Sequence, residues 1–299
     1  MKKALVISGG GSKGAFAGGV AQYLIEEAHQ EYDLYVGTST GSLLISHLAA
    51  GKIETIKNTF TQVQQSDIFS LNPFSVQRTG KIVKSRMNHF NILKNFLKGR
   101  KTFGDSSNLR KLIAHKITPE IHQEVLEKSK EVVVCVSNLT LNKTEYKSLS
   151  SCSYDDFLDW IWVSCNFLPF MSLVIKNRHE YADGGFGCTI AIEEAIRRGA
   201  NQIDAIMLNT EMQQLNRMRS RNAFDVLLST LDFMGDQIIA DNLKVGKLLA
   251  KDKKVDLRLF YTPKVLTTNS LVFDRNEMLK WWEEGWLHAQ SQLTLNSQA

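Results

Sequence analysis

A single serine lies at the apex of a glycine-flanked turn between two apolar runs. Residues 34–36 are apolar, Gly-Thr-Ser-Thr-Gly follows at 37–41, and residues 43–45 are again apolar. This order is typical of a β-strand that turns sharply into an α-helix, because glycine permits a tight backbone turn. The positive N-terminal end of that helix stabilises an anion beside Ser39. The turn therefore predicts a nucleophile for acyl transfer, although a serine in an ordinary strand-to-helix connection has the same pattern.

Strand-like and helical segments alternate along the 299 residues. The strand-like runs lie at residues 3–7, 34–36, 131–136, 205–208 and 257–261. Alternation of this kind favours a mostly parallel sheet that helices cover on both faces. The hydrophobic fraction of 43% and the charged fraction of 22% are those of a globular protein.

A glycine-rich loop follows the first strand-like run. Its sequence is Ser8-Gly9-Gly10-Gly11-Ser12-Lys13-Gly14, and an amphipathic stretch begins at Ala15. Successive backbone N–H groups at a helix N-terminus form an anion site, as the oxyanion of acyl transfer requires. The same glycines also fit the dinucleotide-binding pattern G-x-G-x-x-G. That fold needs an acidic residue at the end of the next strand, whereas Asp33 precedes that strand. Dinucleotide binding is therefore the weaker alternative.

An aspartate followed by two glycines, Asp183-Gly184-Gly185, precedes a helical pattern at residues 190–198. The motif is either a turn or an exposed carboxylate that acts as a general base. A Ser-His-Asp triad would instead use a histidine nearer the C-terminus, and His288 lies in that direction. The residues around His288 predict a helix, whereas the histidine of such a triad usually lies on a loop. The serine–aspartate pair is therefore the favoured interpretation.

The three motifs in this order resemble the patatin-like phospholipase family, and the resemblance extends over roughly residues 2–209. It implies a three-layer α/β/α fold that hydrolyses acyl esters of lipids without a metal or another cofactor. It also implies a nucleophile at Ser39, with Asp183 as its only partner. The implied oxyanion donors are Gly10, Gly11 and Ser12, and Lys13 would face a lipid phosphate. The remaining motif glycines are Gly9, Gly14, Gly37, Gly41, Gly184 and Gly185. A non-lipid serine esterase or an acyltransferase on the same site remains the alternative.

Charge is unevenly distributed along the chain. Residues 60–119 contain eleven Lys and Arg but two Asp and Glu, whereas the whole chain has a net charge of +5. We expect this basic region to be an insertion or lid within a catalytic core at residues 1–209. Such a region either docks on an anionic lipid surface or is a solvated helical subdomain with ordinary surface lysines. No base-reading motif accompanies it, so no nucleic-acid partner is expected. The expected partners are an acyl-lipid substrate and a peripheral membrane surface.

Residues 210–299 predict a helical C-terminal extension packed on the core. Apolar residues at helical spacing predict helices at 223–234 and 236–250, and a final helix at 276–290. The four cysteines have no paired spacing, which predicts neither a disulfide framework nor a zinc site. No run reaches the ~20 apolar residues that span a bilayer, and no signal peptide is evident. A cytoplasmic protein with peripheral membrane contact is therefore expected.

Overall fold

A computed structural model describes residues 1–79, 82–212, 219–220 and 222–296. Its strands are β1 (Lys3–Ile7), β2 (Leu34–Thr38), β3 (Phe74–Thr79), β4 (Ile82–Met87), β5 (Glu131–Asn138), β6 (Lys143–Ser148), β7 (Val174–Lys176), β8 (His179–Asp183), β9 (Gln202–Met207) and β10 (Asp256–Tyr261). Its α-helices are α1 (Gly14–Gln22), α2 (Thr40–Ala50), α3 (Ile53–Gln62), α4 (Gln65–Ile68), α5 (His89–Leu97), α6 (Ser107–Lys116), α7 (Pro119–Glu127), α8 (Tyr154–Ser164), α9 (Ile192–Arg197), α10 (Ala223–Lys253) and α11 (Arg275–Asn296).

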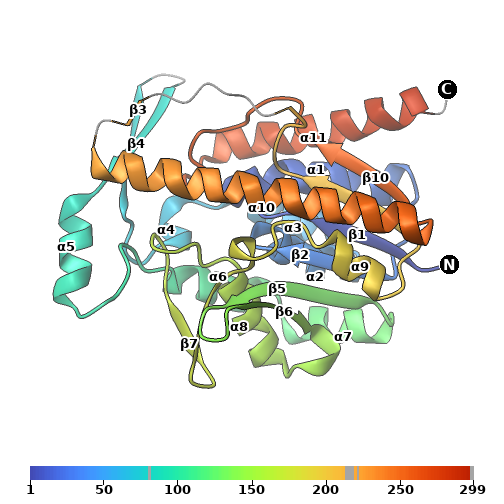
Figure 1. Ribbon diagram of the computed structural model, residues 1–299, viewed down its shortest axis with the longest axis horizontal. Helices are drawn as coiled ribbons and strands as arrows, with labels where there is room; N and C mark the ends of the chain where they lie inside the picture. Colours follow the sequence, from blue (N-terminus) through green and yellow to red (C-terminus); the bar gives the residue numbers. More distant parts are fainter. Residues whose placement is uncertain (80–81, 213–218, 221, 297–299) are drawn as a thin grey trace.

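The central sheet has the strand order β10-β9-β1-β2-β5-β8-β7, with β6 also paired to β5. Strands β10, β9, β1, β2 and β5 are parallel, whereas β6, β7 and β8 run antiparallel to their neighbours. This arrangement confirms the predicted mostly parallel sheet. Figure 1 shows the sheet between α9 and α10 on one side and helices that include α1 and α2 on the other.

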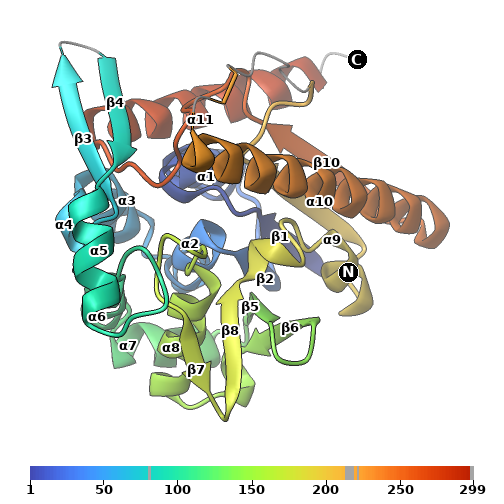
Figure 2. The ribbon, with the colours of Figure 1, turned by 60° about the vertical axis from the view of Figure 1, so that its left-hand side comes forward.

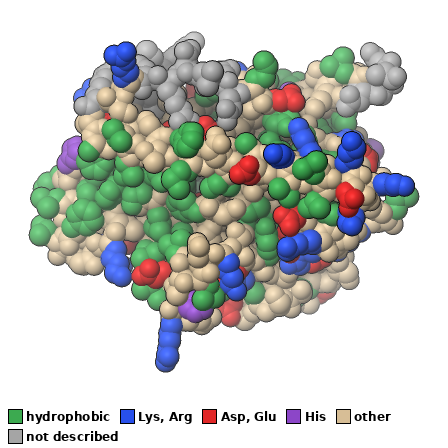
Figure 3. Space-filling view, in the orientation of Figure 1, with side chains coloured by type: hydrophobic (Ala, Val, Ile, Leu, Met, Phe, Trp, Pro, Cys, Tyr) green, Lys and Arg blue, Asp and Glu red, His purple; other side chains and the backbone are tan. Residues whose placement is uncertain are grey.

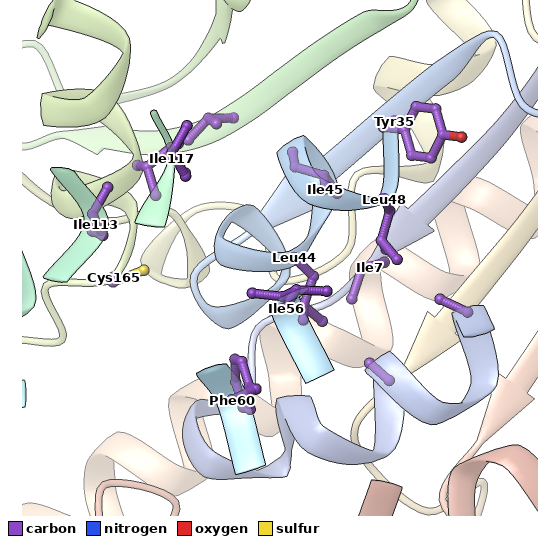
Figure 4. Packing of buried hydrophobic residues seen from close by; sticks show 14 of the residues in the cluster. Ile7, Tyr35, Leu44, Ile45, Leu48, Ile56, Phe60, Ile113, Ile117 and Cys165 are labelled. Carbon is purple, nitrogen blue, oxygen red and sulfur yellow. The ribbon is translucent and has the colours of Figure 1, made fainter. Parts of the chain in front are cut away.

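The alternation of side chains along the strands explains the layers. In β1, Leu5 and Ile7 belong to a large core cluster with α1, α2 and α8, whereas Ala4 and Val6 belong to a second cluster with α9. Successive strand residues point to opposite faces, so fully apolar strands are buried on both sides. Figure 4 shows part of the large cluster, where Leu44 of α2 lies close to Ile56.

The basic region between α2 and β5 contains a separate β-hairpin, β3–β4, and the helix α5. In Figure 2 these elements stand together at one side of the molecule. The only described ladder of this hairpin is its own antiparallel pairing, from Phe74↔Met87 to Thr79↔Ile82. Whether the region acts as a lid remains a prediction.

The C-terminal segment differs from the sequence prediction in one respect. Residues 223–253 form one helix, α10, and not two, because the chain continues helically through Gly235. Glycine disfavours a helix interior by only about 1 kcal/mol, so it does not by itself end a helix. The strand β10 pairs with β9, and α11 packs against α1. None of the described helices has the length and apolar character needed to cross a membrane.

Candidate active site

Ser39 lies in a strained turn between β2 and α2. Its backbone angles are φ 52° and ψ −122°, a conformation that non-glycine residues rarely adopt. Neighbouring glycines allow the turn to pack closely. A Cβ atom at Gly41 would lie 2.3 Å from the Ile7 carbonyl oxygen, and one at Gly37 would lie 2.6 Å from the Gly41 carbonyl carbon. The turn therefore tolerates no side chain at either position.

Strand pairing brings Asp183 to this turn. Strand β2 pairs with one edge of β5 up to Thr38↔Cys135, and β8 continues along that edge from Asp183↔Val136. The two strands approach from opposite directions, so their C-terminal ends meet. Ser39 Oγ donates a hydrogen bond of 2.7 Å to Asp183 Oδ2.

The Asp183 carboxyl is almost inaccessible to solvent, with 3% of the residue exposed. Burial disfavours the charged form and raises the pKa of Asp183 to about 7, although the hydrogen bonds from Ser39 and the Gly185 N–H act in the opposite direction. The Gly185 N–H donates to Asp183 Oδ1 over 2.7 Å, which fixes the orientation of the carboxyl group. A carboxylate with this pKa is a far better base near neutral pH than an ordinary aspartate.

The glycine-rich loop lies beside the serine. A Cβ atom at Gly9 would lie 3.2 Å from Ser39 Cβ, and Gly10 and Gly11 line the same cavity as Ser39. Gly11 has a φ of +55°, which glycine adopts without strain. The Ser12 N–H donates to the Ser270 carbonyl over 2.8 Å, so this group is already occupied and is not a free oxyanion donor.

Two further glycines of the predicted motifs lie where the chain is too closely packed for a side chain. A Cβ atom at Gly14, the first residue of α1, would lie 2.3 Å from Thr40 Oγ1. At Gly184, a Cβ atom would lie 2.3 Å from the Cys135 carbonyl oxygen. Both residues therefore hold the loops close to the serine turn.

Lys13 lies near the end of the glycine-rich loop, beside residues that line the same cavity as Ser39. Its Nζ donates to Asn209 Oδ1 over 3.2 Å, and burial lowers the pKa of the ammonium group to about 8. The carboxylates of Asp232 and Asp236 on α10 partly oppose that shift. The loop thus carries a partly buried cation at neutral pH.

Sequence reasoning missed a residue that supports the serine turn. Ser164, the last residue of α8, accepts a hydrogen bond of 2.9 Å from the Ser39 N–H and donates one of 2.7 Å to the Cys135 carbonyl. In the sequence, Ser164-Cys165-Asn166 interrupts an apolar stretch with polar side chains. This interruption is the one sequence feature that points to a role for Ser164. Asn166 is fully buried, and its backbone carbonyl accepts from the Asp183 N–H. The segment therefore holds both Ser39 and Asp183 by the backbone.

A cavity of about 210 Å³ opens over Ser39 and Asp183. Its apolar lining includes Leu43, Ile68, Leu109, Phe167, Met171, Leu231, Ile239, Leu271 and Phe273. Helix α10 forms part of the wall, and no histidine is among the described residues that line it. His288 is on α11, where its ring contacts Phe16 at a centroid distance of 5.7 Å. In the described part of the chain, no group of three or more His, Cys, Asp or Glu side chains could hold a metal ion.

Comparison with known proteins identifies the family. The family model for patatin-like phospholipase matches residues 5–196, which include the glycine-rich loop, Ser39 and Asp183. A search of curated proteins found no match. Among solved structures, VipD from Legionella pneumophila is similar with a TM-score of 0.48 and 14% sequence identity, over 97% of this chain and 67% of that chain. Because the family model matches well over half of its residues, this chain belongs to the patatin-like phospholipase family.

Proposed function

We propose that the protein is a lipid acyl hydrolase that cleaves fatty-acyl ester bonds with a Ser39–Asp183 dyad. The observation that carries the proposal is the 2.7 Å hydrogen bond from Ser39 Oγ to the buried Asp183 carboxylate, at the base of an apolar cavity. A nucleophilic serine needs a base within this distance to remove its proton. The family membership supports a lipid substrate.

The reaction follows from these positions. Asp183 accepts the Ser39 proton while Ser39 Oγ attacks the ester carbonyl carbon. Gly10 and Gly11 donate their backbone N–H groups to the oxyanion, since the described residues offer these two groups no other acceptor. The C–O bond to the alcohol then breaks, and the alcohol takes the proton from Asp183. A water molecule, deprotonated by Asp183, hydrolyses the acyl-enzyme and returns Ser39 to its starting state.

The molecular surface beside this cavity also supports a lipid substrate. Helix α5 exposes Phe90, Leu93, Phe96 and Leu97, and the neighbouring part of α10 exposes Val226, Phe233 and Met234. The two helices meet where the ring of Phe224 lies 5.2 Å from that of His89. Figure 3 shows a broad area of hydrophobic side chains at the α5 end of α10. Large exposed apolar areas are typical of surfaces that contact a membrane or a protein partner.

Hydrolysis of a fluorescent lipid panel tests the dyad. We expect Ser39→Ala and Asp183→Asn to abolish fatty-acid release and His288→Gln to retain it, because His288 does not line the cavity. A fluorophosphonate probe should label the wild type and the His288 variant but not Ser39→Ala. Release that survives Asp183→Asn but is lost in His288→Gln would contradict the proposal. If Ser39 is not labelled, the nucleophile is not functional.

A further inference from the structure

A second cavity, of about 50 Å³, adjoins the catalytic cavity and is not lined by the glycine-rich loop. Leu43, Ile68, Leu109 and Phe273 line both cavities, so the two share one apolar wall. The second cavity lies between helices α2, α3 and α6. Nothing in the dyad mechanism requires this space.

Helix α2 connects the nucleophile to this space. Leu43 and His47 line the second cavity, and they are four and eight residues after Ser39. At 1.5 Å per residue they lie roughly 6 and 12 Å along the helix axis from the nucleophile. Residues four apart share one face of a helix, so this face of α2 leads directly from Ser39 into the second cavity.

Two other helices line the space with mostly apolar faces, to which Thr59 and Lys116 are the exceptions. From the α3 segment the lining residues are Ile56, Thr59, Phe60 and Val63, and from α6 they are Leu109, Leu112, Ile113 and Lys116. Both sets have the spacing i, i+3, i+4, i+7, which is one continuous helix face. Figure 4 shows Ile56, Phe60 and Ile113 around α2. The walls therefore run parallel to the helices for two turns.

The cavity contains almost no polar surface. His47 is 1% exposed, and its Nε2 donates to the Lys116 carbonyl over 3.0 Å. Burial lowers the pKa of His47 to about 4, so its ring is neutral at physiological pH. A space lined in this way stays dry and receives hydrocarbon more readily than water.

We propose that the second cavity binds the far methylenes of the substrate's acyl chain, with Ile113 and His47 setting the chain length that fits. The inference rests on the proposed function, since the ester carbonyl must be held at Ser39 for its chain to extend along α2. Each methylene that leaves water gains about fourfold in affinity. Several methylenes in the cavity therefore favour a medium or long acyl chain over a short one by well over tenfold.

The test compares p-nitrophenyl decanoate with p-nitrophenyl butyrate. Ile113 is 3% exposed and lines only the second cavity, so Ile113→Phe fills that space without touching the catalytic one. We expect kcat/KM for decanoate to fall at least tenfold and kcat/KM for butyrate to stay within twofold. Ile121→Phe in α7 is the matched control, because Ile121 is similarly buried but does not line the cavity. In Ile121→Phe, the ratio of kcat/KM for decanoate to kcat/KM for butyrate should equal that of the wild type.

An unchanged ratio in a folded Ile113→Phe protein would overturn the inference. If that variant does not fold, Ile113→Ala replaces it, and the preference must then shift toward palmitate. If the wild type cleaves neither ester, the proposed function fails, and calorimetry with decanoic acid tests the cavity alone. Binding that Ile113→Phe removes and Ile121→Phe keeps would still support the acyl site, whereas no binding would exclude it.

Discussion

In the proposed dyad, burial gives Asp183 the base strength that a serine hydrolase usually obtains from histidine. An exposed aspartate, with a pKa near 3.9, is a poor base for a hydroxyl group, whereas burial brings the pKa of Asp183 to about 7. Only the ionised carboxylate can accept the Ser39 proton. We therefore expect kcat/KM for a soluble ester to rise with pH, to reach half of its maximum near pH 7, and to fall about tenfold for each pH unit below that value. A rate that stays constant between pH 5 and pH 9 would contradict this role.

The Ser164 hydroxyl positions Ser39, the proposed nucleophile, by accepting a hydrogen bond from its backbone N–H. Without the Ser164 hydroxyl, the Ser39 N–H would lose its acceptor in a turn that is already strained. We expect Ser164→Ala to lower the free energy of unfolding by about 1–3 kcal/mol. We also expect kcat to fall at least tenfold, with little change in KM.

Ser46→Ala is the control for that variant, because Ser46 is buried on α2 and its hydroxyl has no partner among the described residues. Unfolding in urea and steady-state kinetics measure the two effects. If Ser164→Ala behaves as Ser46→Ala does, the hydrogen bond to the turn has no functional role.

At the scale of elements, the packing of α11 on α1 depends on the fit between one large residue and two glycines. Trp282 is 1% exposed, and a Cβ atom at Gly18 would lie 2.1 Å from its ring. At Gly19, a Cβ atom would lie 1.9 Å from the Trp282 carbonyl oxygen. The indole N–H also donates to Gln22 Oε1 over 2.7 Å. The two helices therefore approach closely around this side chain.

We expect Trp282→Ala to lower the free energy of unfolding by about 3–5 kcal/mol, because it leaves a cavity between the helices. Trp286→Ala should cost less, since Trp286 is half-buried and contacts Tyr23 at the edge of the same interface. Urea denaturation of both variants measures the difference. Equal losses of stability in the two variants would mean that the close fit of Trp282 against Gly18 and Gly19 adds no stability of its own.

Elements differ in how well the sequence predicts them. The strand–turn–helix around Ser39 and the Gly9–Gly11 loop are local patterns of glycine and apolar residues, so their elements could be predicted. The meeting of β8 with β2 depends on how both pair with β5, which no local pattern encodes. The prediction of two helices at 223–234 and 236–250 is wrong, because α10 continues through Gly235, and glycine disfavours a helix interior only weakly. The role of Ser164 was also hidden, since its partners lie 29 and 125 residues away.

At the scale of the whole molecule, charge and apolar surface coincide on one side. No Asp or Glu lies between Asp67 and Asp105, whereas Lys94, Lys98 and Lys101 lie on or just after the apolar helix α5. Apolar side chains with nearby cations suit an anionic lipid surface, where each cation contributes about 1 kcal/mol.

We therefore expect the protein to bind phosphatidylglycerol vesicles, and more weakly as salt increases. Leu97→Gln should weaken binding roughly tenfold, because the burial of one leucine contributes about 1.5 kcal/mol or more. Leu141→Gln, an exposed apolar site between β5 and β6, is the matched control. Vesicle sedimentation measures both. Equal binding of the wild type and the two variants would mean that α5 does not contact the lipid.

The meeting of β2 and β8 on β5 has a consequence for the newly made chain. The two halves of the dyad are 144 residues apart in sequence, and neither reaches the other until β5 has paired with both strands. A chain still on the ribosome, or one that has lost this pairing, carries Ser39 without its hydrogen-bond partner Asp183. If Ser39 and Asp183 act together as proposed, ester hydrolysis therefore becomes possible only after folding has brought the ends of β2 and β8 together.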